Sequence, residues 1–498
     1  MTLDEITQAV LTISPQLLDP REAAALVESC GMNDRIAKSD LDMLDTFAVG
    51  SHIVRHNRVR GRVVTNEPAK RTATSFAQEA RIAAQKFSVN FAYALPWALL
   101  LVVDYLNPNL LRLSPQSGGV LSLTLIASLI IAGGFSQAIM RIGYFYIGMK
   151  EPKLALRMCL LFLKWGSFTS LALATAGFFL AYYFRLFEPV YLAWGCVNFL
   201  LLSALWMFCA MLSVQSRVWR IPLVFVLGGA MFALLHHRFG VLIPITAADA
   251  TSLICASAFS VLGFRRLPSA APRSAPAPPL PRLSVISIML LPFFLYGPTY
   301  FAFLFADRIA AGSAIPWASG LSFGIDSQYK QGMDVALCIF LVLAAMVEYL
   351  ADRFTRYWFR VAEEVVDIER LLRAFYRRSL FAVCMLFAPL SLGLWLMYQH
   401  FQHKVLLTAV LGSLGYFFVA LALFNLIVLF SVNCAYRALE VLSIALVFNC
   451  VIGYTFGHVF GVEFAPIGLL AGGLVLFICS YRAIRTVLER ADYYYALA

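Results

Sequence analysis

The stretch GGVLSLTLIASLIIAGGFSQAIM, residues 118–140, is apolar and contains no charged side chain. A helix needs about 20 such residues to cross a bilayer, so this stretch predicts a membrane span. Similar runs fill most of the chain, which is 61% hydrophobic and 13% charged. Soluble domains average about 45–50% apolar and 25% charged residues. We therefore expect an all-α polytopic membrane protein. The continuous runs exclude a membrane β-barrel, whose strands alternate polar and apolar residues.

Twelve spans are expected, six on each side of a proline-rich break. They lie at about 87–105, 118–140, 160–184, 189–213, 220–237, 240–263, 284–306, 333–351, 379–399, 405–430, 437–456 and 464–482. The break, RRLPSAAPRSAPAPPLPR at 265–282, predicts an extended solvated linker because proline disrupts helices. The expected domains are an N-terminal extension (1–85), a first six-helix bundle (86–264), the linker (265–282), a second bundle (283–485) and a tail (486–498).

The distribution of basic residues predicts the orientation. If the N-terminus is cytosolic, only six of the 39 Lys and Arg residues fall in outward-facing loops. Both termini are therefore expected inside, and the N-terminal extension, which has no basic and apolar leader, is expected to be a short helical arm rather than a signal peptide. Two arm helices are expected, one from Pro20 to about Gly31 and one capped by Ser39. A basic, turn-rich stretch from His52 to Arg71 follows.

The two halves begin alike. The first span carries Tyr93-Ala-Leu-Pro96 and ends in Asp104-Tyr105, and the seventh carries Tyr296-Gly-Pro298 and ends in Asp307-Arg308. Because proline removes a helical hydrogen bond, we expect Pro96 and Pro298 to kink their spans. Residues 361–378 are apolar at helical spacing and predict an amphipathic helix along the inner surface. Pseudo-symmetric bundles joined by a cytosolic linker indicate a transporter that works by alternating access.

Ionisable groups inside hydrocarbon are expensive, so each is a candidate for function. Asp249, near the middle of span six, either couples transport to an ion gradient or is hydrogen-bonded to Thr246, Thr251 or a facing helix. Asp104 and Asp307 lie near outer span ends, where they either form a gate or bind an amino sugar, or are simply interfacial. The substrate or coupling-ion candidates are Asp249, Asp104, Asp307, Arg308, Tyr296, Tyr300, Asn90, Lys164 and Glu348.

The layout and two stretches of sequence resemble the MOP superfamily of multidrug exporters, lipid-linked oligosaccharide flippases and polysaccharide exporters. Phe305-Ala306-Asp307-Arg308 and the run 333–341, leading to Val347-Glu348-Tyr349, are similar to the exporter of the Pel exopolysaccharide system. The resemblance implies export of a polysaccharide or lipid-linked glycan across a bacterial inner membrane. The implied partners are membrane lipid, the glycan, and a polysaccharide synthase complex that docks on the arm. Lys164 could then attract the diphosphate of a lipid-linked glycan.

Other functions remain open. A drug or small-metabolite exporter of the same fold is the nearest alternative, followed by a membrane glycosyltransferase or acyltransferase and by a structural subunit of a synthase complex. No GxxxxGK[ST] motif occurs, which argues against ATP hydrolysis through a P-loop. The ten cysteines form no CxxC pair, and the net charge of +11 is explained by topology rather than by nucleic-acid binding. We expect no metal, no cofactor and no enzymatic activity.

Overall fold

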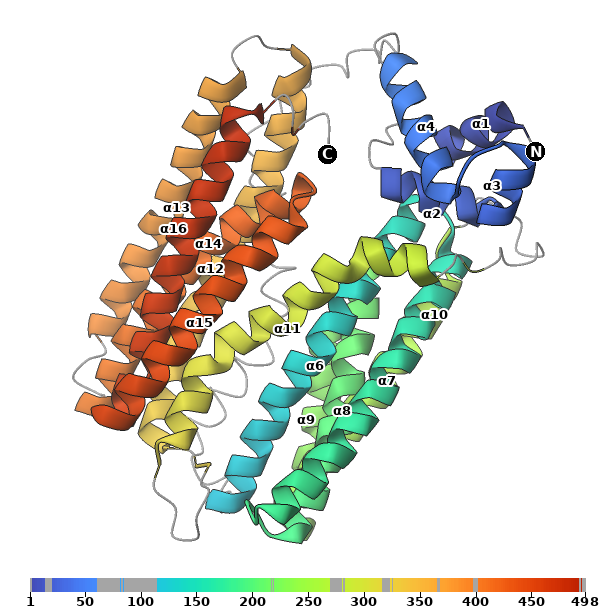
Figure 1. Ribbon diagram of the computed structural model, residues 1–498. Coiled ribbons are helices and arrows are strands. Elements are labelled where there is room, and N and C mark those ends of the chain that lie inside the picture. The colour runs from blue at the N-terminus through green and yellow to red at the C-terminus, as the bar shows by residue number, and fades with distance from the viewer. Residues whose placement is uncertain are drawn as a thin grey trace.

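The computed structural model describes residues 2–13, 20–60, 81, 84, 114–215, 217, 219–268, 280, 283–315, 323, 324, 326–364, 368–396, 402–491 and 494. These segments are almost entirely helical (Figure 1). The arm contains α1 (Leu3–Ile13), α2 (Pro20–Ser29), α3 (Asp34–Asp40) and α4 (Thr46–Arg60). The first bundle contains α6 (Pro115–Gly148), α7 (Pro152–Tyr183), α8 (Pro189–Val214), α9 (Arg220–Phe239) and α10 (Leu242–Arg265). The second contains α11 (Leu283–Ser313), α12 (Ser327–Glu364), α13 (Ile368–Leu396), α14 (His403–Ser431), α15 (Ala435–Val459), the short 3-10 helix η2 (Val462–Phe464) and α16 (Pro466–Glu489).

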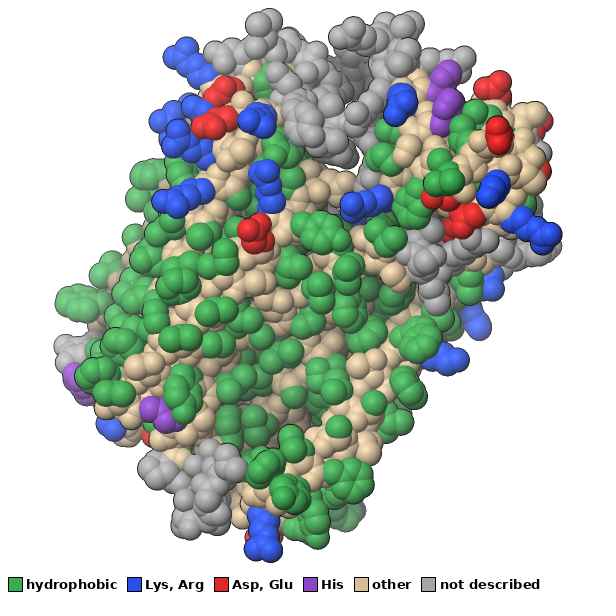
Figure 2. Space-filling model, in the orientation of Figure 1, with side chains coloured by type: hydrophobic (Ala, Val, Ile, Leu, Met, Phe, Trp, Pro, Cys, Tyr) green, Lys and Arg blue, Asp and Glu red, His purple; other side chains and the backbone are tan. Residues whose placement is uncertain are grey.

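Eleven of the described helices are long and apolar enough to cross a bilayer. They correspond to predicted spans two to twelve, so the predicted polytopic all-helical fold is confirmed. Predicted span one, 87–105, lies outside the described residues, together with the candidates Asn90, Pro96 and Asp104. We call the end of the molecule that carries α1–α4 the arm side and the opposite end the far side. Figure 2 shows a band of hydrophobic side chains with Lys and Arg gathered toward the arm side.

The predicted inner-surface helix over 361–378 is wrong. Its residues are divided between the end of α12, at Glu364, and the beginning of α13, at Ile368. The 38 residues of α12 would extend about 57 Å at 1.5 Å per residue, well beyond the hydrocarbon core. The amphipathic pattern therefore belongs to the ends of two long spans that project past the membrane. The residues after predicted span two also form no separate surface helix. Helix α6 continues to Gly148, and α7 begins at Pro152.

The arm has four described helices where two were predicted. Its α2 confirms the helix that begins at Pro20, but Ser39 lies inside α3 and caps nothing. Asn33 accepts a hydrogen bond from Ile36 N (2.9 Å) to cap α3, and Asp45 accepts one from Ala48 N (2.7 Å) before α4. Helix α4 also covers residues 52–60 of the stretch that was predicted to be turn-rich.

The arm packs onto the membrane helices through α2 and the end of α6. Phe145 of α6 and Met149, which follows the helix, join the apolar core of the arm helices. Arg141 of α6 forms an ion pair with Glu22 of α2 (2.8 Å), and its guanidinium lies 5.0 Å from the centre of the Phe293 ring of α11. One arginine thus connects the arm, the first bundle and α11.

The main contact between the bundles, among the described helices, joins α6 to α11, which crosses diagonally from one bundle to the other (Figure 1). Gly133 and Gly134 of α6 face Gly297 of α11 with their backbones in contact. A methyl group on Gly297 would lie 2.7 Å from Gly134 N, and one on Gly134 would lie 2.8 Å from Phe294 O. Glycine is required here because backbone occupies the space that a side chain would fill.

We predict that Gly297→Ala destabilises the protein and impairs transport, because the new methyl group pushes α11 away from α6. Overpacking of this kind costs about 1–3 kcal/mol. Thermal unfolding of the purified protein in detergent should show a lower midpoint. Gly177→Ala is the matched control, since Gly177 is also helical and has open space around its Cβ position. Equal midpoints for the two variants would contradict the prediction.

Candidate functional site

Two charged residues predicted from the sequence lie inside the second bundle. Asp307 and Arg308, near the far-side end of α11, face α12. Asp307 is fully buried, and its Oδ2 accepts a hydrogen bond from the hydroxyl of Tyr329 (2.6 Å). Arg308 Nη2 lies 3.5 Å from Asp334 Oδ1, and Asp334 also pairs with Lys330 Nζ at 3.3 Å. The hairpin of α11 and α12 thus places two acids and two bases together.

The start of α12 sets the geometry of this hairpin. Asp326 precedes the helix and accepts a hydrogen bond from Tyr329 N at 2.7 Å, which satisfies one of the free amides of the first turn. Tyr329 is thereby held with its hydroxyl toward Asp307. Asp334 lies further along α12, opposite Arg308, because neighbouring antiparallel helices bring such positions side by side.

Tyr416 of α14 completes what we call the buried charge cluster. Tyr416 is fully buried, stacks on Phe340 at 5.0 Å, and interacts electrostatically with Arg308. The cluster comprises Asp307, Arg308, Tyr329, Asp334 and Tyr416.

Several polar atoms of the buried charge cluster have no hydrogen-bond partner among the described residues. They are Asp307 Oδ1, Arg308 Nε, and Arg308 Nη2 apart from its ion pair with Asp334. Buried polar atoms are nearly always hydrogen-bonded, so Asp307 Oδ1 can take up a proton or accept from a water, and the N–H groups of Arg308 can donate to a water. Adding a proton or cation at Asp307 would weaken its attraction to Arg308 and shift that guanidinium toward Asp334. Protonation of Asp307 would thus alter the balance of charge between α11 and α12.

Tyr296 and Tyr300 lie on the same face of α11 as Asp307. Their rings stack with centroids 5.6 Å apart, and Tyr296 also meets Phe430 edge-on at 4.7 Å. Glu348 is exposed on α12, in the neighbourhood of Tyr300 and of Tyr144 of α6. These residues extend polar character from the buried charge cluster toward the first bundle.

The remaining candidates lie elsewhere. Asp249 is half-buried in α10 and forms no hydrogen bond or ion pair with the described residues. Thr246, its expected partner, instead accepts from Trp194 Nε1 (2.9 Å) and donates to Leu242 O (3.1 Å). Lys164 is exposed on α7. Helix α11 continues through Pro292 and Pro298, and the kink expected at Pro298 stays a prediction.

Sequence reasoning missed Tyr329, Asp334 and Tyr416. Asp334 could have been predicted, because it is an acid at the start of an apolar run, just as Asp307 is an acid near the end of one. Tyr329 and Tyr416 carry no such signal, because only the packing of α11, α12 and α14 brings them to Asp307.

We predict that Arg308→Gln destabilises the protein, since it removes the guanidinium that pairs with Asp334 and lies near the buried carboxyl of Asp307. Breaking a buried ion pair from one side costs about 3–5 kcal/mol. Adding Asp307→Asn should restore part of the loss, because one of the two acids left near the missing guanidinium is then neutral. Thermal unfolding of the two variants checks this, with exposed Arg437→Gln as control. A double variant no more stable than Arg308→Gln would contradict an interaction between Asp307 and Arg308.

The comparisons with known proteins give the fold. The similar solved structures include a MATE transporter in complex with MaD3S (TM-score 0.56, 15% identity, covering 82% of this chain and 96% of that one). An outward-facing multidrug resistance MATE family transporter of the MOP superfamily gives the same values. A mutant form of the Vibrio cholerae MATE transporter VcmN aligns with a TM-score of 0.58 and 13% identity, covering 84% of this chain and 99% of that one. No protein-family model and no curated protein matches the sequence. At these identities the likeness establishes the fold alone: the chain has the fold of the MATE transporters of the MOP superfamily.

Proposed function

We propose that the protein is a bacterial inner-membrane exporter that moves an exopolysaccharide or a lipid-linked oligosaccharide by alternating access of its two bundles. The observation that carries the transporter function is the fold: two bundles whose described helices meet mainly where α6 crosses α11. A contact concentrated at one crossing lets the bundles tilt relative to each other with little repacking, which is the motion that alternating access requires.

Our proposal for the substrate class rests on where the two stretches that resemble polysaccharide exporters lie in the structure. Residues 305–308 contribute Asp307 and Arg308 to the buried charge cluster, and residues 333–341 contribute Asp334. Apolar spans resemble one another through composition alone, whereas buried charges are expensive and are retained for a purpose. A resemblance that falls on the buried charge cluster therefore supports a shared function more than a resemblance between lipid-facing segments would.

The orientation and partners follow from the distribution of charge. The arm side carries the gathered Lys and Arg of Figure 2, so we assign it to the cytoplasm. There, Lys164 and Arg157 of α7 are placed to attract an anionic lipid diphosphate. The arm helices α1–α4 project from the membrane helices on the same side, where they could bind a polysaccharide synthase complex.

Coupling to an ion gradient is assigned to two carboxylates, one in each bundle. Asp307 has one oxygen held by Tyr329 and one without a partner among the described residues. Asp249 likewise has no partner in the described part of the chain and lies in a helix of the first bundle. Each can bind a proton or cation during the transport cycle, and neither position needs an additional cofactor.

Export of drugs is the second candidate function. The observation in its favour is that a similar structure is named a multidrug resistance transporter. Both functions use the same fold and the same coupling groups, so only the cargo distinguishes them.

We predict that the purified protein in proteoliposomes flips a fluorescent polyprenyl-diphosphate oligosaccharide, and that Asp307→Asn and Asp249→Asn each slow this flipping at least about tenfold, a loss of roughly 1.4 kcal/mol. Both variants keep side-chain size and remove the charge that binds the ion. Flipping is measured as the fraction of label protected from a membrane-impermeant quencher.

Asp352→Asn is the matched control, because Asp352 pairs with Arg356 near the arm-side end of α12, outside the buried charge cluster. A parallel assay follows ethidium efflux. Ethidium transport without glycan flipping would replace the glycan proposal by drug export, and loss of flipping in Asp352→Asn would remove the specific role of Asp307 and Asp249.

A further inference from the structure

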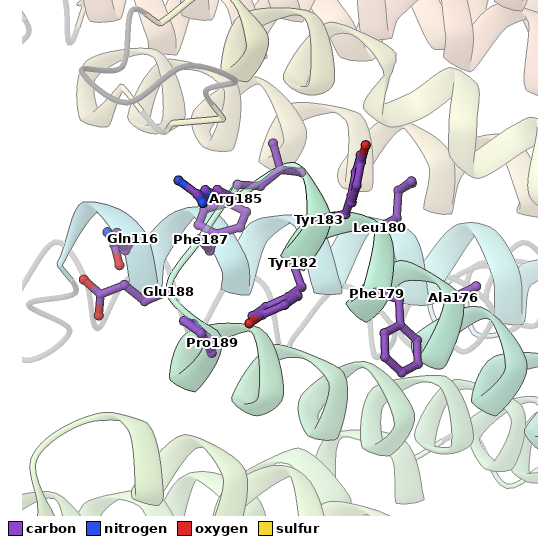
Figure 3. Close-up of a pocket in the computed structure, with 11 residues that line it drawn as sticks. Gln116, Ala176, Phe179, Leu180, Tyr182, Tyr183, Arg185, Phe187, Glu188 and Pro189 are labelled. Carbon is purple, nitrogen blue, oxygen red and sulfur yellow. The ribbon is translucent and has the colours of Figure 1, made fainter.

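A broad cavity opens at the far side of the first bundle, away from the buried charge cluster. It has a volume of about 1100 Å³ and lies where α7 ends, α8 begins and α6 starts (Figure 3). Small-molecule pockets measure roughly 300–1,000 Å³, so this one can hold several linked units of a larger ligand. Its polar lining comes from Gln116, Arg185 and Glu188, and its aromatic lining includes Tyr182, Tyr183 and Phe187.

The tyrosine rings that line the cavity are exposed and not buried in the core of the bundle. Tyr183 is 79% exposed and Tyr182 is 56% exposed, and both lie in the last turn of α7. Aromatic side chains are common at membrane surfaces, where they form belts facing lipid. Here the rings instead border a cavity that also contains a guanidinium, a carboxylate and an amide.

Gln116 and Arg185 supply polar groups to the cavity wall. The carbonyl oxygen of Gln116 is buried in the wall of the cavity and has no hydrogen-bond partner among the described residues. Arg185 follows α7 in the left-handed conformation, with φ of 53°, at the position where helices usually place glycine. A side chain there costs on the order of 1–2 kcal/mol. The guanidinium of Arg185 contributes a cation to the lining of the cavity.

The combination defines a chemical class of ligand. Sugar rings present C–H faces that stack on aromatic side chains, and hydroxyl groups that hydrogen-bond to amides, carboxylates and guanidinium groups. A cavity with exposed rings and one of each such polar group, carrying no net charge from Arg185 and Glu188, fits a neutral or amino-sugar oligosaccharide better than a lipid tail or a polyanion.

The cavity also lies where the bundles meet. Phe187 borders Gly119 of α6, and a methyl group at Gly119 would lie 3.3 Å from the Phe187 ring and 3.0 Å from Phe323 O, in the connection between α11 and α12. In Figure 3, Tyr183 and Leu180 point toward the helices of the second bundle. We propose that this far-side cavity binds oligosaccharide units of the exported glycan as they leave the path between the bundles, an inference that rests on the proposed function.

The test measures oligosaccharide binding to the full-length protein in lipid nanodiscs, by isothermal titration. The probes are cellotetraose, maltotetraose, chitotetraose and its deacetylated form. Wild type should bind at least one probe. Tyr182→Ala and Arg185→Gly should each weaken that binding at least about tenfold, which corresponds to 1.4 kcal/mol. Tyr454→Ala is the matched control, because Tyr454 is also 56% exposed but lies in α15, outside the cavity.

Arg185→Gly separates binding from folding. Glycine relieves the left-handed strain, so this variant should unfold at the same temperature as wild type or higher while it binds the probe less tightly. The proposal is overturned if wild type binds none of the probes, or if Tyr182→Ala and Arg185→Gly bind as wild type does. Normal glycan flipping without probe binding would refute oligosaccharide binding in the cavity alone. Probe binding without any flipping would refute the proposed transport and leave the binding site supported.

Discussion

The close approach of α6 and α11 is the constraint on which the arrangement of the two bundles depends. Gly133, Gly134 and Gly297 bring two helix backbones together without side chains between them. In lipid there is little hydrophobic drive to associate helices, so close backbone packing supplies much of the attraction. Pro298 follows Gly297 directly and cannot donate to Phe294 O, the carbonyl that lies against Gly134. The crossing is therefore tight and locally weak in helical hydrogen bonds.

The same helix that makes this crossing carries the charges of the second bundle. Asp307 lies ten residues beyond Gly297, which is about 15 Å along α11. A tilt of α11 about the crossing consequently displaces Asp307 and Arg308 relative to Asp334 and Tyr416. Conversely, a change of charge at Asp307 alters the forces on the far-side half of α11. The crossing and the buried charge cluster share no residue, but they are mechanically coupled because both lie on α11.

The sequence was sufficient for eleven of the twelve predicted spans and for part of the candidate site. Asp307 and Arg308 were recognisable because a charge within an apolar run is costly, wherever the chain goes. Tyr329 and Tyr416 could not be recognised, since tyrosine is unremarkable in a membrane span and acquires its role only through packing. The stretch 361–378 failed for a different reason: an amphipathic pattern is the same whether a helix lies on the membrane or projects from it as the end of a span. The prediction that Ser39 caps a helix was wrong because Asn33 and Asp45, whose side chains cap helices equally well, lie nearby and do so instead.

The arm contacts α6 and α11 on the other side of their crossing, toward the arm side. Arg141 lies eight residues from Gly133, about 12 Å along α6 toward the arm side, and contacts both Glu22 of α2 and the ring of Phe293 on α11. Separation of α6 and α11 on the arm side would pull Phe293 away from Arg141, whereas movement of α2 would pull Arg141 through its carboxylate partner. A molecule that binds α1–α4 would therefore act on the angle between α6 and α11, and through α11 on Asp307. Under the proposed function, Arg141 is the link through which a partner bound to the arm would influence transport.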